Sequence, residues 1–201
     1  NVYKNDPNWV PPLIIEKKMM LDKKKNPFFE HGEMDIFMAY SDGKAVGRIA
    51  AIINYTHNQI HNEKAGFFGF FECLDNQDAA NALFDTAVQW IKDKGMTKVI
   101  GPASPTSNDE YGFLIEGAEG SPVLMMPYNP KYYIRLLENY GFKKAKDLYA
   151  YIMESDKIFY DEKILRGSEL VRKRNNVTIR TLDMKNFKNE LDIVKQIYNK
   201  A

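Results

Sequence analysis

The chain has 201 residues and a mass of 23.3 kDa, so it holds at most one full domain and part of another. Hydrophobic residues make up 44% of it and charged residues 27%, which excludes disordered, collagen-like and disulfide-rich classes of protein. Lysine and arginine number 28 against 27 aspartates and glutamates, so the net charge of +1 provides no bulk attraction to nucleic acid.

Cysteine content and hydropathy bear on the location of the protein. The single cysteine, Cys73, cannot form an internal disulfide, which is compatible with a reducing compartment. No apolar run reaches the ~18 residues of a membrane helix, and no signal peptide is visible. We therefore expect a cytoplasmic protein with no integral membrane segment and no nucleic-acid partner. The chain begins at Asn1 rather than Met, which suggests a trimmed start.

The first 33 residues predict an extended segment and then a short helix. Prolines at positions 7, 11 and 12 hold the preceding residues out of the helical region. Apolar residues gather over residues 13–24, where we expect the helix, and Asn26-Pro27 ends it.

Residues 35–54 predict a β-hairpin, because two apolar segments flank the turn sequence Asp42-Gly43. A polar loop with His57 and His61 is expected next. Residues 65–74, AGFFGFFECL, predict a third strand. Its aromatic residues come in pairs rather than in alternation, which indicates a central strand buried on both faces.

The clearest predicted helix covers residues 78–94. Asp75 or Asn76 can cap its start, and Gly95 lies just past its end. One apolar stripe follows the helical period, and its members are Ala80, Leu83, Phe84, Ala87, Val88 and Ile91. A short strand over residues 97–102 then ends at Pro102.

A long turn-rich loop, a helix and a strand are expected in the next 50 residues. The loop covers residues 103–121, the helix residues 131–139 with Gly141 at its end, and the strand residues 145–153. Alternation of strands and helices indicates a mixed sheet with some parallel pairing.

The character of the chain changes after Met153. Residues 154–176 are highly charged and predict a linker helix or tether with a solvated face, rather than a nucleic-acid site. Residues 177–182 then predict a strand, and residues 186–200 an amphipathic helix. We expect these last 25 residues, 177–201, to open a second domain that is truncated.

The order of these elements resembles that of the GNAT superfamily of acyl-CoA N-acyltransferases. The segments that carry the resemblance are GFFGFFECL, the helix that follows it, TKVIGP, and PKYYIRLLENYGF with its Gly141-Phe142 pair. Together with DPNWVPPL, NPFFEHGE and MPYNP, they resemble a branch of large bacterial proteins with two GNAT-like halves. The resemblance implies an α+β fold with a mixed, mainly antiparallel central sheet flanked by helices.

The resemblance also implies a domain plan. Residues 1–153 would form a GNAT-like domain whose first strand lies before residue 1. Residues 154–176 would be the charged linker, and residues 177–201 the start of the second GNAT-like half in the same chain.

The implied activity is acyl transfer from a CoA thioester, either acetyl-CoA or a longer acyl-CoA, to an amine without a metal. The acceptor would be a small-molecule or lipid amine, including long-chain amines such as sphingoid bases. The alternative is a non-catalytic binding or scaffolding domain that has lost the CoA pyrophosphate site. The turn at residues 75–81 supports this alternative, because it lacks the glycines and the arginine of the family's phosphate turn.

Residues for the co-substrate follow from the resemblance. The family's contacts with the thioester map to residues 70–74, where Gly69 gives the preceding backbone freedom to bend. Within this stretch, the residues predicted to contact the co-substrate are Phe71, Cys73 and Leu74. The pyrophosphate contacts map to Gln77, Ala79, Ala80 and Asn81. The other reading of this turn is a capped helix start, in which Asp75 and Asp78 repel phosphate.

Glu72 is the candidate catalytic base. It follows an apolar strand, and a low-dielectric cleft would raise the pKa of its carboxyl group toward neutrality. The alternative is a strand-end residue that faces solvent or pairs with Arg48. The family's usual acid, a tyrosine, is replaced here by Leu137, and the tyrosines that could substitute or simply pack in the core are Tyr132, Tyr133 and Tyr140.

Two segments are the predicted substrate pocket. The loop at residues 104–117 is longer than most structureless connections and carries two adjacent carboxylates beside an aromatic residue, which suits an amine or polyol. The resemblance places residues 126–133 on the same side of the sheet. The predicted contacts are Asn108, Asp109, Glu110, Tyr111, Tyr128, Asn129 and Tyr132. The alternative is a surface loop that hydrogen-bonds to itself.

The histidines and the cysteine predict no metal site. His57 and His61 have helical spacing but would need a helix and a third ligand, and their polar neighbours predict a loop. His31 stands apart from both. Cys73 has no partner cysteine and no evident base, so we expect a buried structural thiol.

Overall fold

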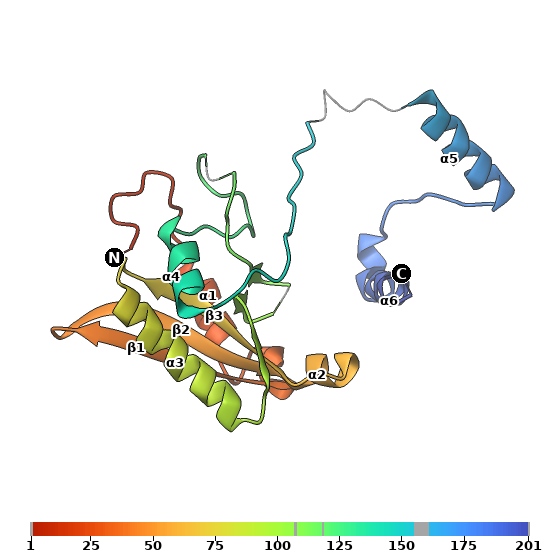
Figure 1. Ribbon diagram of the computed structural model, residues 1–201. Helices are drawn as coiled ribbons and strands as arrows, with labels where there is room; N and C mark the ends of the chain where they lie inside the picture. The colour runs from red at the N-terminus through yellow and green to blue at the C-terminus, as the bar shows by residue number, and fades with distance from the viewer. Residues whose placement is uncertain (1, 107, 118, 155–160, 201) are drawn as a thin grey trace. The chain divides into compact units, whose positions relative to one another are not determined.

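The computed structural model describes residues 2–106, 108–117, 119–154 and 161–200 (Figure 1). It divides into two compact units, residues 1–148 and residues 149–201. Most of the secondary structure, and the whole sheet, belongs to the first unit.

The first unit is built on a four-stranded sheet with strands in the order β1-β2-β3-β4. Strands β1 (Gly32–Ser41), β2 (Lys44–Asn54) and β3 (Ala65–Cys73) are antiparallel neighbours, and β4 (Lys98–Ile100) pairs parallel to β3. The predicted α+β fold with a mainly antiparallel sheet and some parallel pairing is confirmed.

The hairpin turn forms where the sequence predicts it. Asp42 and Gly43 have φ angles of 49° and 72°. Two consecutive residues in the left-handed region match the twist of the flanking strands, which is the reason that Asp-Gly favours two-residue hairpins. The turn thus fixes the register of β1 against β2.

One face of the sheet is covered by α3 (Gln77–Asp93). Ile49 and Ala51 of β2 point to this face and share a buried cluster with Leu83 and Phe84 of α3. Helix α4 (Tyr132–Tyr140) packs against α3 and completes the cluster with Leu136. Of the six residues of the predicted apolar stripe, five lie in this cluster, and Val88 is half-buried outside it.

The opposite face carries a second cluster. The alternate residues of β2, Ala50 and Ile52, meet Phe67 of β3 and Phe28 of the short helix η1 (Pro27–Glu30) there. Helix α1 (Ile14–Leu21) contributes only Leu21 to this cluster. Helices α1 and α3 therefore lie on opposite faces of the sheet (Figure 1).

Helix ends follow the predicted capping residues. The side chain of Asn76 accepts a hydrogen bond from the backbone N–H of Ala79 at 3.0 Å and caps α3. Gly95 and Gly141 follow α3 and α4 with φ angles of 81° and 106°, which glycine adopts without steric cost.

Two segments that were predicted as loops contain regular secondary structure. The polar segment with His57 and His61 is helix α2 (Tyr55–His61), and the loop prediction there was wrong. Asn54 begins this helix, because its side chain accepts a hydrogen bond from the N–H of His57 at 2.9 Å. Within residues 103–121, β5 (Ala103–Ser104) and β6 (Glu110–Tyr111) form a small antiparallel sheet.

Two predicted strands are not formed. Residues 145–153 and 177–182 have no regular secondary structure, and their apolar side chains are largely exposed. Their apolar pattern is compatible with a strand, but a strand also needs a neighbour whose backbone groups complete its hydrogen bonds. Within the described residues neither segment has such a neighbour.

The second unit contains two helices, α5 (Glu162–Arg174) and α6 (Phe187–Tyr198), and the short η3 (Met184–Asn186). Helix α5 lies in the predicted charged linker, of which residues 155–160 fall outside the described residues. Arg180 donates to both carboxylate oxygens of Glu190 at 2.9 and 3.0 Å, which ties α6 to the segment before it.

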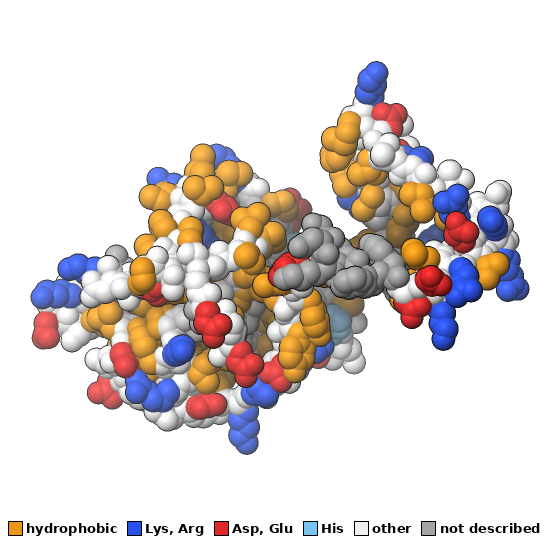
Figure 2. Space-filling model, turned by 90° about the horizontal axis from the view of Figure 1, so that it is seen from above, with side chains coloured by type: hydrophobic (Ala, Val, Ile, Leu, Met, Phe, Trp, Pro, Cys, Tyr) orange, Lys and Arg blue, Asp and Glu red, His pale blue; other side chains and the backbone are white. Residues whose placement is uncertain are grey.

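Charged side chains of both signs lie among apolar ones on the surface of the molecule (Figure 2). None of the helices in the described ranges is both long enough and apolar enough to cross a membrane.

We expect Phe84→Ala to lower the free energy of unfolding by about 3–5 kcal/mol, because it removes a fully buried ring. That ring stacks on Phe71 at 4.8 Å and lies 5.0 Å from the ring of Tyr140. Urea unfolding measures the loss. The control is Gln89→Ala on the exposed side of α3, expected within about 0.5 kcal/mol of wild type. Equal effects of the two substitutions would contradict the assignment of the core.

Candidate active site

Strand β3 contains a β-bulge next to its end. Ala50 pairs with Gly69 and Arg48 pairs with Glu72, so one residue of β2 lies opposite two residues of β3. The first of these two, Phe70, has a φ angle of 48°. An extra residue in one strand is the defining feature of a β-bulge.

The bulge decides which way the end of β3 faces. Side chains alternate along a strand, so one inserted residue moves every later side chain to the other face. Phe71 therefore points into the cluster under α3, while Glu72 lies on the opposite face beside Arg48. Without the extra residue, Glu72 would point into the apolar cluster.

Two contacts hold the bulge. The backbone N–H of Phe70 donates to the hydroxyl of Ser104 at 2.9 Å. Gly69 lies so close to β5 that a Cβ atom in its place would be 1.7 Å from the carbonyl oxygen of Ala103. The segment after β4 thus crosses β3 at the bulge, and only glycine allows this approach.

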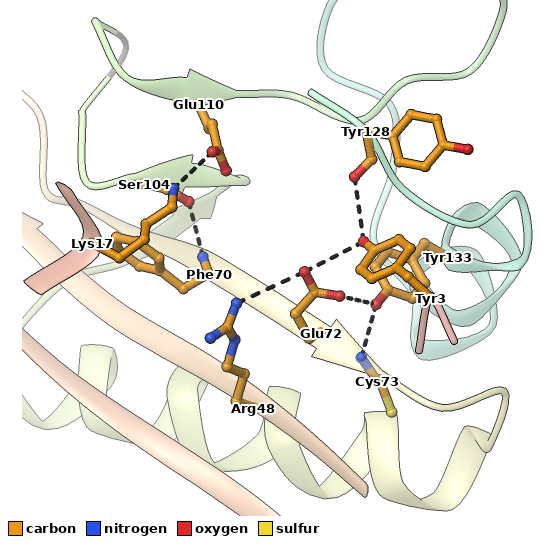
Figure 3. A network of polar contacts seen from close by, with 10 residues as sticks. All are labelled: Tyr3, Lys17, Arg48, Phe70, Glu72, Cys73, Ser104, Glu110, Tyr128 and Tyr133. Carbon is orange, nitrogen blue, oxygen red and sulfur yellow. Dashed lines mark hydrogen bonds and ion pairs between the residues drawn. The ribbon is translucent and has the colours of Figure 1, made fainter. Parts of the chain in front are cut away.

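Glu72 is held by three side chains from distant parts of the chain (Figure 3). Tyr133 donates its hydroxyl proton to Oε2 at 2.7 Å, and Tyr3 donates to Oε1 at 3.3 Å. The Nη2 atom of Arg48 lies 3.8 Å from Oε1. The side chain of Glu72 retains 27% of its accessible surface, so a small molecule can reach it.

The two tyrosines are themselves fixed. Tyr133 is buried, and its hydroxyl oxygen accepts a hydrogen bond from the N–H of Cys73 at 2.9 Å. Because that oxygen has a donor of its own, the hydroxyl proton is directed at Glu72. Tyr3 stacks on Trp9 at 5.0 Å between ring centroids and also lies 3.3 Å from the carbonyl oxygen of Tyr128.

Burial raises the pKa of the Glu72 carboxyl above its usual value. The hydrogen bonds from Tyr133 and Tyr3 and the charge of Arg48 oppose this rise in pKa without cancelling it. Burial also raises the pKa of the hydroxyl groups of Tyr3 and Tyr133, with a further contribution from the charge of Glu72. Both tyrosines therefore stay protonated and act as hydrogen-bond donors to Glu72.

The residues predicted to contact the thioester lie at the bulge, but two of their side chains are packed. Phe71 stacks on Phe84, and Cys73 is fully buried, with the pKa of its thiol raised by burial to about 11. Leu74 is partly exposed, and its N–H donates to the carbonyl oxygen of Val46 at 2.9 Å. The predicted buried thiol is confirmed, whereas the thioester contacts stay a prediction.

In the turn predicted to bind pyrophosphate, the hydrogen-bond donors are bonded to other groups of the protein. The N–H groups of Ala79 and Ala80 both donate to Asn76, to its side chain and its carbonyl oxygen. The side-chain amide of Gln77 donates to Asn81 and to the carbonyl oxygen of Leu136 in α4.

The turn has no arginine of its own, but an arginine of α4 reaches it. Arg135 forms an ion pair with Asp75. The geometry favours the alternative reading of a capped helix start, and the pyrophosphate contact stays a prediction.

Four of the predicted substrate residues lie in the loop before and within β6. The carboxylate of Asp109 accepts hydrogen bonds from the N–H and the hydroxyl of Thr106, and the N–H of Asn108 donates to the same hydroxyl. Glu110 pairs with Lys17 of α1 at 2.7 Å, and Tyr111 packs against the second cluster. This tip of the loop hydrogen-bonds to itself, and Ser107 lies outside the described residues.

The other three predicted substrate residues lie in and just before α4, and their polar groups bond to three different parts of the chain. The hydroxyl of Tyr128 donates to Asp6 at 2.7 Å, and the hydroxyl of Tyr132 donates to the carbonyl oxygen of Cys73 at 2.7 Å. Asn129 is buried and accepts a hydrogen bond from the N–H of Leu114 at 2.7 Å. Tyr132 thus contacts the residue next to Glu72, Tyr128 approaches the site only through its carbonyl oxygen beside Tyr3, and Asn129 fixes the loop at Leu114.

Two members of the site were missed from the sequence. Tyr3 lies 69 residues from Glu72 in the chain, and Ser104 lies 34 residues from Phe70. No local sequence pattern predicts contacts between residues that are so far apart in the chain. Tyr133 was among the tyrosines considered, and it is both packed in the core and bonded to Glu72.

The two histidines of α2 share a helix face after all. The ring centroids of His57 and His61 are 4.4 Å apart, and burial lowers the pKa of His57. The Nε2 atom of His57 is buried without a hydrogen-bond partner. Among residues 2–106, 108–117, 119–154 and 161–200, no group of three His, Cys, Asp or Glu side chains is placed to hold a metal ion.

The chain is similar to two curated proteins over almost its whole length. It is 35% identical over 199 residues to Protein YghO of Escherichia coli (strain K12) and 34% identical over 197 residues to Bacterial ceramide synthase of Caulobacter vibrioides (strain NA1000 / CB15N). These alignments cover 99% and 98% of the chain, but 50% and 51% of the two relatives. The chain thus spans about half the length of each relative. No family model and no solved structure matches it.

The raised pKa of Glu72 predicts a specific pH dependence of stability. A carboxyl whose pKa is higher in the folded than in the unfolded chain binds more protons when folded, so the free energy of unfolding falls as pH rises between the two pKa values. Glu72→Gln removes the ionisable group and therefore this loss of stability with rising pH. We expect the variant to gain stability relative to wild type as pH rises above the unfolded pKa of about 4.5, measured by urea unfolding.

The matched control, Glu33→Gln, should change stability with pH in the opposite direction. Hydrogen bonds from Lys94 and Tyr55 lower the pKa of Glu33 on β1, so its contribution is present above the unfolded pKa and is lost as pH falls. Glu33→Gln should therefore lose stability relative to wild type as pH rises. Parallel profiles for the two variants would show that Glu72 is not destabilised by its site.

Proposed function

We propose that this chain is one half of an acyl-CoA-dependent N-acyltransferase of the GNAT superfamily, and that Glu72 is its general base. The observation that carries the proposal is the carboxylate at the bulge of β3. It is partly buried, its pKa is raised, and two tyrosines and an arginine fix its position. A reachable carboxylate with a raised pKa is suited to proton transfer near neutral pH.

In the proposed reaction, an amine attacks the carbonyl carbon of the thioester. The bond between carbon and nitrogen forms, the bond between carbon and sulfur breaks, and CoA leaves as a thiolate that takes up a proton. Glu72 removes the proton that the amine nitrogen loses. Tyr133 acts as a positioning residue, because it holds Oε2 while Oε1 lies between Tyr3 and Arg48.

The proposed acceptor is a lipid amine, and specifically a sphingoid base. The support is the name of one relative, Bacterial ceramide synthase, because a ceramide is the amide of a sphingoid base and a fatty acid. The donor would accordingly be a long-chain acyl-CoA. The proposed domain plan assigns residues 1–153 to the first GNAT-like half, residues 154–176 to the linker and residues 177–201 to the start of the second.

A second candidate function is a non-catalytic GNAT-like binding or scaffolding domain. The observation that favours it is the start of α3, where Asn76 takes up the N–H groups of Ala79 and Ala80 and two carboxylates replace the family's glycines. In that case the CoA pyrophosphate site is lost and the protein does not bind acyl-CoA.

We expect Glu72→Gln in the full-length protein to lower kcat by roughly 10²–10⁴-fold, the usual contribution of a positioned general base. The assay follows release of CoA from a long-chain acyl-CoA in the presence of sphinganine. KM for the acyl-CoA should stay close to wild type, because the amide keeps the shape of the side chain. Glu33→Gln on β1 is the control and should retain full activity. Undiminished turnover by Glu72→Gln would remove this residue from the mechanism.

A thermal-shift scan with CoA, acetyl-CoA and palmitoyl-CoA separates the two candidate functions. A ligand at 100 times its Kd stabilises the folded protein by about 2.7 kcal/mol, so Tm should rise by several degrees. The transferase predicts such a shift for the full-length protein with palmitoyl-CoA. A flat response of the full-length protein to all three ligands would favour the scaffolding domain.

A further inference from the structure

Helix α1 and the residues before it expose an unusual amount of apolar surface. No residue of α1 is buried. Five large apolar side chains of this segment are between 55% and 74% exposed, namely Val10, Leu13, Ile14, Ile15 and Met19. Clustered apolar exposure of this kind marks a surface for interaction rather than a folding core.

The segment is nevertheless held in place on the sheet. Leu21 packs into the second cluster, and the ammonium group of Lys17 lies 5.9 Å from the centre of the Phe70 ring while it pairs with Glu110. The side chain of Asn26 donates to the carbonyl oxygen of Met20 at 2.6 Å. The helix is thus anchored by a few contacts, and its apolar side chains are presented to the solvent.

Positive charge accompanies the apolar residues. Residues 16–25 contain five lysines and two acidic residues, whereas the whole chain is nearly neutral at +1. The lysines stand directly after the apolar group, at positions 17, 18, 23, 24 and 25. Exposed apolar side chains next to lysines can enter the headgroup region of a bilayer while the lysines meet its anionic phosphates.

A groove joins this surface to the candidate site. It has a volume of about 410 Å³ and lies between α1 and β2, lined by Pro12, Ile14, Lys17, Lys18, Leu21 and Arg48. Arg48, one of the residues that line it, pairs with Glu72. A bilayer in contact with α1 would therefore lie directly outside the site.

We propose that α1 and the residues before it, 10–25, dock the protein peripherally on an anionic lipid bilayer. The apolar side chains enter the headgroup region, and Lys18 and Lys24 contact the lipid phosphates, while Lys17, Lys23 and Lys25 pair with carboxylates of the chain. The complementary charge is the reason for assigning a bilayer rather than a second copy of the chain, whose corresponding lysines would repel it. Docking does not require acyl transfer, so it can be tested apart from the proposed function.

The test is flotation of the full-length protein with vesicles of phosphatidylcholine alone and with about 30 mol% phosphatidylglycerol. We expect binding to the anionic vesicles, weakened at high salt because screening shortens the range of the lysine charges. Ile14→Glu and Ile15→Glu should each weaken binding about tenfold or more, through loss of apolar burial. Lys18→Gln and Lys24→Gln should each weaken it about fivefold, equivalent to about 1 kcal/mol per lysine.

The matched control is Ile60→Glu in α2, where an equally exposed isoleucine at 71% lies outside the proposed surface. It should leave vesicle binding unchanged. The proposal is overturned if wild type binds neither vesicle, or if Ile60→Glu weakens binding as much as Ile14→Glu does. It is also overturned if Ile14→Glu only dissolves a dimer seen in sedimentation without changing vesicle binding. Unchanged Tm values for all variants exclude unfolding as the cause.

Discussion

The extra residue at the bulge of β3 is the constraint on which the rest of the candidate site depends. Alternation along a strand is strict, so a charged side chain and an aromatic one at neighbouring positions always face opposite ways. The bulge sends Phe71 into the cluster under α3 and turns Glu72 toward Arg48. Without it, the core would hold a carboxylate among fully buried aromatic rings, where an unpaired charge is very costly, and the aromatic ring would be exposed. One inserted residue therefore satisfies both the packing of the core and the placement of the acid.

The environment of Glu72 balances two opposing effects. Burial destabilises its charged form, while hydrogen bonds from Tyr3 and Tyr133 stabilise that form. A fully buried carboxylate would stay neutral, and a fully exposed one would be a weak base at neutral pH. The donors come from the N-terminal segment and from α4, which are far from β3 in sequence. The proton affinity of Glu72 is thus a property of the folded unit rather than of β3 alone.

Local patterns predicted most of the first unit. The Asp42-Gly43 turn, the stripe of α3 and its cap at Asn76 each depend on neighbours within one or two turns of chain, and each is found. The predicted strand at residues 145–153 failed because strand formation depends on a partner that its own sequence does not specify. The same distinction applies to the site. Glu72 could be proposed from its place after an apolar strand, but Tyr3 and Ser104 reach β3 only through the tertiary fold.

The distribution of charge around Glu72 bears on how an amine would arrive. Two of the positive groups on this face, Arg48 and Lys17 of α1, are each paired with a carboxylate. The Arg48 pair is the looser one, since its atoms are 3.8 Å apart and the arginine is about half exposed. Partly exposed pairs of this kind contribute little free energy, so in the proposed reaction the ammonium group of an amine would compete with Arg48 for Oε1 at small cost. Tyr133 keeps its hold on Oε2 during such an exchange, because its hydroxyl is fixed by the N–H of Cys73. One oxygen of Glu72 is therefore held by the short hydrogen bond from Tyr133, and the other has only the longer contacts with Tyr3 and Arg48.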